Sequence, residues 1–263
     1  IHEAMTSLAE NITQLDLDFL ILVTPHGLSC DNKFGIVENE QLRGHLPYLT
    51  ISNVDGDKIY RTIKIPGAPL ESRSLLYFLK NQKLDVSSLI FGSKSFPFPL
   101  AWGEIVPLYY LQIVSNLSIP TIIISLPQSR AELQKFLPRI KNFGRCLGDF
   151  LMHSTNSFGL ILSGDLAHAH KNEGPYGYDA NAQLFDESIC NYMQSLESEI
   201  LYYSIEQYED TALSCGISTL IILDQIIKLH AKKNAEANSW KLKTFEYAVP
   251  SYFGMAVGEY FST

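Results

Sequence analysis

The sequence predicts a single α/β domain with a mostly parallel central sheet and helices on both faces. The apolar runs at residues 18–24, 120–126 and 158–163 have strand length and no polar alternation, which is typical of strands buried on both faces. Segments with apolar residues at helical spacing separate these runs, as the connections of a parallel sheet require. No linker-like change in composition divides the chain, so we expect one domain over residues 1–263.

The remaining elements follow from residue spacing and from turn signals. Residues 46–65 predict a β-hairpin, because Asp55-Gly56 in its middle is a strong turn dipeptide. Pro107 fits the first turn of a helix over residues 104–116, where the missing N–H of proline is tolerated. The other predicted segments are helices over residues 3–15, 70–84, 130–154, 180–190 and 216–233, strands over residues 88–91, 240–248 and 252–261, and a loop over residues 95–100.

Composition and charge exclude several classes of function. The net charge of -8, from 28 acidic and 20 basic residues, argues against a nucleic-acid-binding surface. The longest apolar runs are too short to span a membrane, and no secretory signal pattern is present. The chain opens on Ile1, within a predicted helical segment and without an initiator methionine. We expect a cytoplasmic protein with free thiols, because the cysteines are scattered and form no C-x-x-C pair: Cys30, Cys146, Cys190 and Cys215.

The strongest candidate site follows the strand predicted at residues 158–163. Asp165, His168 and His170 lie just past the carboxyl end of this strand, which is the usual position of a site in an open α/β sheet. His26 follows the first strand in the same way, so we expect His26 and His168 to lie in one crevice. The alternative is a surface loop whose histidines have no chemical role.

Two side chains have the chemistry of metal ligands. His26 lies between a proline and a glycine, and a neutral imidazole binds Fe, Zn or Mn readily. The alternative is a histidine satisfied by hydrogen bonds at a strand end. Glu246 is a carboxylate among apolar residues, so its burial would require a partner such as a metal ion. An exposed, outward-facing glutamate is the alternative there.

A series of short motifs runs in order along nearly the whole chain. Their order and spacing resemble the class III, LigB-type extradiol ring-cleavage dioxygenase superfamily, whose relatives include the Memo-like proteins. The motifs are Pro25-His26-Gly27, Trp102-Gly103 with Val106-Pro107-Leu108, Ser163-Gly164-Asp165-Leu166 with His168, Gly174-Pro175 with Gly177-Tyr178, Phe185-Asp186, Cys215-Gly216, and Phe253-Gly254-Met255-Ala256-Val257.

The resemblance implies a non-haem Fe(II) enzyme that breaks down aromatic compounds, with Zn or Mn as alternative metals. In this family two histidines and a carboxylate hold the iron, which leaves positions for a catechol and O₂. The resemblance makes His26 one metal ligand, Glu246 the carboxylate ligand and His168 the acid/base residue. It also implies a small aromatic diol and O₂ as substrates, and a homodimer or a second subunit as partner. The expected substrate contacts are Trp102, Asp165, Pro175, Tyr176 and Tyr178.

Two departures from the family pattern support a second hypothesis. The first metal histidine of the family has no match in this chain; His2 lies in the following helix, and His45 is a candidate substitute. Trp102 stands where the family usually has a histidine, and tryptophan cannot transfer a proton, although it can wall an aromatic pocket. The second hypothesis is therefore a noncatalytic Memo-like protein or pseudoenzyme subunit that acts through interactions. A metal-dependent hydrolase with similar ligands is the third.

Overall fold

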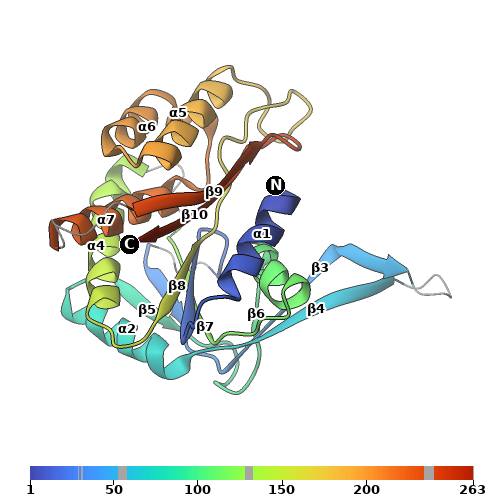
Figure 1. Cartoon of the computed structure of the whole chain (residues 1–263), viewed down its shortest axis with the longest axis vertical. Coiled ribbons are helices and arrows are strands. Elements are labelled where there is room, and N and C mark those ends of the chain that lie inside the picture. Colours follow the sequence, from blue (N-terminus) through green and yellow to red (C-terminus); the bar gives the residue numbers. More distant parts are fainter. Residues whose placement is uncertain (29, 31, 53–57, 128–132, 234–239, 263) are drawn as a thin grey trace. The chain divides into compact units, whose positions relative to one another are not determined.

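The computed structural model describes residues 1–28, 30, 32–52, 58–127, 133–233 and 240–262, and it confirms the α/β class (Figure 1). Its central sheet has five strands in the order β5-β2-β7-β1-β8. The middle strand β1 (Phe19–Thr24) pairs in parallel with both β7 (Thr121–Ser125) and β8 (Phe158–Leu162). The strand β2 (Phe34–Val37) pairs in parallel with β5 (Val86–Leu89) and antiparallel with β7. The sheet is therefore mostly parallel, as predicted.

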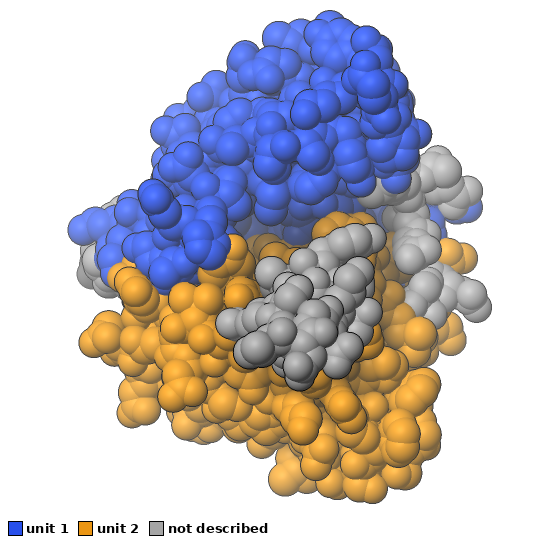
Figure 2. Space-filling view, turned by 90° about the vertical axis from the view of Figure 1, so that its right-hand side faces the viewer, with its two compact units in different colours: residues 1–8, 129–153, 164–263 blue, residues 9–128, 154–163 orange. Residues whose placement is uncertain are grey.

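The chain divides into two compact units, which Figure 2 colours blue and orange. Unit 1 comprises Ile1–Leu8, Ser129–His153 and Gly164–Thr263, and unit 2 comprises Ala9–Gln128 and Ser154–Ser163. The central sheet belongs entirely to unit 2. That residues 1–263 fold as one domain stays a prediction.

The other described elements are assigned to the units by their residue ranges. The helix α1 (His2–Ile12) has residues in both units. Unit 2 also contains β3 (Gln41–Ser52), β4 (Lys58–Pro66) and β6 (Phe98–Pro99), which form one sheet, and the helices α2 (Pro69–Asn81), α3 (Trp102–Tyr109) and the π-helical η1 (Tyr110–Val114). Unit 1 contains α4 (Leu133–Met152), α5 (Asn181–Ser195), α6 (Ser198–Ala212), α7 (Ile217–Lys233) and the antiparallel pair β9 (Trp240–Ala248) and β10 (Met255–Ser262).

Side chains alternate between the two faces of the sheet along each strand, and those of β1 are buried on both faces. In β1, Leu20 and Leu22 point to one face and share a hydrophobic core with residues of α1 and α3. Ile21 and Val23 point to the opposite face and are also fully buried. The helix α2 contacts β2, β5 and β7. The burial explains why the strand segments lack polar alternation.

The strand β8 differs from the prediction of a buried strand. It lies at one edge of the central sheet and its residues are only half-buried. An apolar run has the same appearance in the sequence whether one or two neighbouring strands cover it. The prediction of a strand at residues 158–163 is confirmed, whereas the prediction of its full burial is wrong.

The helix predicted over residues 104–116 also differs from the structure. It begins at Trp102, and its last part is the π-helical turn η1. Pro107 therefore lies inside α3 rather than in its first turn. Because proline has no N–H, the carbonyl of Gly103, four residues earlier, has no helical donor.

Several elements were absent from the sequence prediction or are shifted from it. The strand β2 and the helix α6 were not predicted, and β5 lies two residues before the strand predicted at 88–91. The loop predicted over residues 95–100 contains the short strand β6. The predicted turn at Asp55-Gly56 lies outside the described residues, as does the predicted start of the helix over residues 130–154. In the part of the chain that the structure describes, every helix is too short or too polar to span a bilayer.

Candidate functional site

In unit 2, His26 lies in the turn that follows the carboxyl end of β1. Its backbone N–H donates to Thr24 Oγ1 at 3.1 Å, and its ring centroid lies 4.3 Å from that of Trp102. A Cβ on Gly103 would come within 2.7 Å of Thr24 Oγ1 and 2.8 Å of His26 Cβ. Only glycine at position 103 therefore lets the start of α3 approach His26 so closely. The predicted pocket residue Trp102 is half exposed beside His26.

Glu104, on the first turn of α3, is a buried acid that was not predicted as a site residue. Its Oε2 accepts the Ala101 N–H at 2.9 Å. Among the described residues, neither Glu104 Oε1 nor Ser125 Oγ has a hydrogen-bond partner, and both are buried. A Cβ on Gly27 would come within 2.1 Å of Ser125 Oγ and 2.8 Å of Glu104 Oε1, so both oxygens face the residue after His26.

The burial of Glu104 shifts the pKa of its carboxyl group. Removal from solvent raises the pKa of Glu104 from its ordinary value of 4.5 to about 7, against the lowering effect of backbone hydrogen bonds from Glu104 and Ala101. The sequence signal for Glu104 was only its place in the first turn of a helix, where an acidic side chain commonly caps the backbone. Nothing in that position indicated complete burial.

Ser163, which directly follows β8, donates a hydrogen bond to the α3 carbonyl that lacks a helical donor because Pro107 has no N–H. Its Oγ donates to the Gly103 carbonyl at 2.7 Å. We expect Ser163→Ala to lower the free energy of unfolding by about 1 kcal/mol, because a partly buried carbonyl loses its donor. In a Pro107→Ala background this cost should largely disappear, because the alanine introduced there has an N–H for the same carbonyl. Urea unfolding of the four proteins measures the coupling; equal costs of Ser163→Ala in both backgrounds would contradict this assignment.

In unit 1, His168 lies in an aromatic setting. Its side chain is buried, and its Nε2 lies 3.7 Å from Asp165 Oδ2. The His168 ring stacks on Tyr176 at a centroid distance of 5.4 Å and has edge contacts with Tyr252 and Phe253 at 6.1 and 6.2 Å. The structure therefore brings together the predicted acid/base residue and two predicted substrate contacts, Asp165 and Tyr176. Tyr252 and Phe253 were not predicted from the sequence as site residues.

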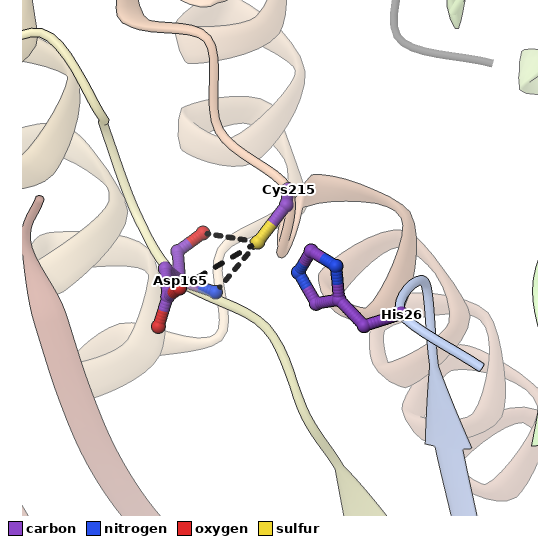
Figure 3. Close-up of side chains that lie close together, drawn as sticks. All are labelled: His26, Asp165 and Cys215. Carbon is purple, nitrogen blue, oxygen red and sulfur yellow. Dashed lines mark hydrogen bonds between the residues drawn. The ribbon is translucent and has the colours of Figure 1, made fainter. Parts of the chain in front are cut away.

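Asp165 is held against the segment that precedes α7. Its N–H donates to Cys215 Sγ at 3.0 Å, and the thiol lies 3.9 Å from Asp165 Oδ2, as Figure 3 shows. Ser214 Oγ donates to the Asp165 carbonyl at 2.9 Å. A Cβ on Gly164 would come within 2.5 Å of Gly216 Cα, so this approach of two backbones requires glycine.

The loop after His170 carries the remaining predicted substrate contacts. Gly177 has a φ of +73°, a left-handed conformation that favours glycine. Tyr176 is partly exposed but reaches the His168 ring. Pro175 and Tyr178 are exposed, and their contacts with a substrate stay predictions.

The predicted metal ligands lie in different units. His26 belongs to unit 2, whereas Glu246 lies on β9 in unit 1, where its side chain is exposed. Glu246 is therefore an exposed, outward-facing glutamate, which was the alternative prediction, and not a buried carboxylate. His45, the candidate substitute ligand, is also exposed. A crevice that contains His26, His168 and Glu246 requires residues of both units and stays a prediction.

Comparisons with known proteins find a similar sequence and a similar structure, but they do not assign the chain to a family. No family model matches the chain. Protein CA_C1420 of Clostridium acetobutylicum is 22% identical over 223 residues, which are 84% of this chain and 45% of that protein. The chain therefore spans less than half the length of this relative. The crystal structure of the uncharacterized protein JW3007 of Escherichia coli K12 matches with a TM-score of 0.59 and 15% identity, over 97% of this chain and 89% of that one. At this identity the match shows the fold alone.

Proposed function

We propose that the protein is a metal-dependent enzyme that cleaves a catecholic ring with O₂, in the manner of the extradiol dioxygenases. The observation that carries the proposal is the setting of His168, a buried imidazole beside Asp165 with Tyr176, Tyr252 and Phe253 around it. Aromatic rings favour a flat aromatic ligand through stacking and edge contacts. A histidine within reach of such a ligand is the usual group for proton transfer near neutral pH.

His168 has a defined part in the proposed reaction. It accepts the proton of one diol hydroxyl as the substrate binds, and it returns a proton as the ring opens. Asp165, with its Oδ2 3.7 Å from His168 Nε2, stabilises the imidazolium that forms. Tyr176 lies nearly parallel to the imidazole, with 25° between the two ring planes, and limits the approach to one side of it.

The donor set of the chain fits a divalent transition metal. His26 offers a nitrogen, Asp165 a carboxylate oxygen and Cys215 a sulfur. Iron(II) and zinc both accept such ligands, although the set differs from two histidines and a carboxylate. When bound, the metal would supply coordination for both diol oxygens and for O₂.

The test is reconstitution of the full chain with Fe(II) without oxygen, followed by metal analysis and a panel of catechols in air. We expect bound iron and a yellow ring-opened product. His26→Ala should lose the iron. His168→Ala should keep the iron and lose about 100-fold or more in turnover, the usual size of a general acid/base contribution. His153→Ala is the matched control, because His153 is an exposed histidine that follows α4.

The noncatalytic hypothesis remains the second candidate, since two observations favour it. Glu246 is exposed, and Trp102 takes the place beside His26 where the resemblance leads us to expect a histidine. An interaction protein of this kind would take up no iron and turn over no catechol in the same experiment.

A further inference from the structure

Asp186, on α5, is a fully buried carboxylate with a hydrogen bond from each of three segments of unit 1. Its Oδ1 accepts the Ala167 N–H at 2.8 Å. Its Oδ2 lies 2.8 Å from His170 Nε2 and accepts the Tyr247 hydroxyl at 2.9 Å. Burial raises the pKa of Asp186, whereas the hydrogen bonds from Ala167, Tyr247 and His170 act in the opposite direction.

These bonds hold the chain in place on both sides of His168. Ala167 comes directly before His168, and His170 follows it by two residues. One carboxylate therefore fixes the backbone on one side and a side chain on the other. Tyr247, on β9, holds the same oxygen of Asp186 as His170.

The segment around His168 has no helix or strand of its own, so its position depends on such bonds. Its amides bond to separate parts of unit 1: Leu166 N–H to the Gly254 carbonyl, His168 N–H to the Ala212 carbonyl and His170 N–H to the Tyr252 carbonyl. The Ala167 amide differs, because its acceptor is the Asp186 side chain. Among the acceptors of these four amides, Asp186 is thus the one side chain, and it bonds to the residue directly before His168.

We propose that Asp186, with His170 and Tyr247, is a positioning network that sets the place and orientation of the His168 ring. The inference deepens the proposed function and rests on it for the role of His168 in proton transfer. Asp186 itself does not touch the reacting atoms. Its effect on the reaction passes through the backbone at Ala167 and through the partner at His170.

The direct test is a nuclear magnetic resonance spectrum of the full, metal-free chain with ¹⁵N-labelled histidine rings. The His168 signals are assigned by their loss in His168→Gln. We expect Asp186→Asn to shift the His168 ring signals, because Asn keeps one acceptor but turns a donor towards His170 and Tyr247. Glu187→Gln is the matched control, an exposed acid on the same helix that should leave His168 unchanged. Unchanged His168 signals in Asp186→Asn would overturn the proposal.

A second variant covers the case in which Asp186→Asn does not fold. Tyr247→Phe removes one donor to Oδ2, and it should shift the His168 signals in the same direction by less. A purely structural role would lower the unfolding midpoint and leave these signals in place, which would overturn the proposal.

Measurements of turnover distinguish a failure of this inference from a failure of the proposed function. With iron and a catechol, Asp186→Asn should lower kcat about 100-fold, the usual loss when a reacting group is misplaced by about 1 Å, and Glu187→Gln should not. If the wild-type chain cleaves no catechol, the proposed function fails, while the spectrum still decides the positioning of His168.

Discussion

Gly254→Ala is expected to lower the free energy of unfolding by about 3 kcal/mol or more. A Cβ at this position would come within 1.8 Å of Asp186 Oδ2 and 2.8 Å of Asp186 Cγ. Overpacking in a well-packed interior costs about 1–3 kcal/mol, and a lost hydrogen bond to a charged group adds about 1.5–3 kcal/mol. Asp186 cannot move away without losing bonds, because both of its oxygens are bonded.

Urea unfolding measures this loss directly. The matched control is Gly258→Ala on β10, where a new Cβ would meet Met193 Cε at 3.0 Å, the far end of a flexible side chain. We expect the control to stay within about 1 kcal/mol of the wild type. Equal midpoints for Gly254→Ala and wild type would mean that the carboxylate of Asp186 does not lie against Gly254.

Glu104 is expected to make the stability of the protein fall as the pH rises from about 4.5 to about 7. Burial raises the pKa of Glu104 to about 7, so over this range the folded chain keeps a proton that the unfolded chain releases. The stabilising contribution is complete below pH 4.5 and is lost as the pH passes through 7. The full change is about 3 kcal/mol, from about 1.4 kcal/mol per pKa unit.

Glu104→Gln isolates this contribution, since glutamine has similar size and does not titrate. Urea unfolding of both proteins at several pH values should show the variant gaining about 3 kcal/mol relative to wild type between about pH 4.5 and 8. Glu40→Gln, an exposed acid of unit 2, is the control and should show no such trend. A difference between Glu104→Gln and wild type that does not change with pH would contradict a protonated, buried Glu104.

Much of the central sheet could be predicted because it depends on local patterns. The strands β1 and β7 are continuous apolar runs, and the structure buries them on both faces. The same pattern could not distinguish the edge strand β8 from a central strand, because segments distant in the sequence determine how many strands lie beside it. The strand β2, FGIV, was missed because four residues give too little periodicity.

The candidate site was predictable only in part. The positions of His26 and His168 after strand ends were visible in the sequence, and the structure confirms both strands. The contacts of Tyr252 with His168 and of Tyr247 with Asp186 join residues far apart in the chain, so no spacing rule reveals them. The burial of Glu104 and the exposure of Glu246 likewise depend on tertiary packing, which residue type alone does not fix.

The most direct test of the central claim, that His26 and His168 serve one ring-cleaving reaction, is oxygen uptake by the Fe(II)-loaded chain with a catechol. We expect one O₂ consumed per catechol ring opened, with uptake lost in both His26→Ala and His168→Ala. Uptake that is absent in the wild type, or unchanged in either variant, would contradict the claim.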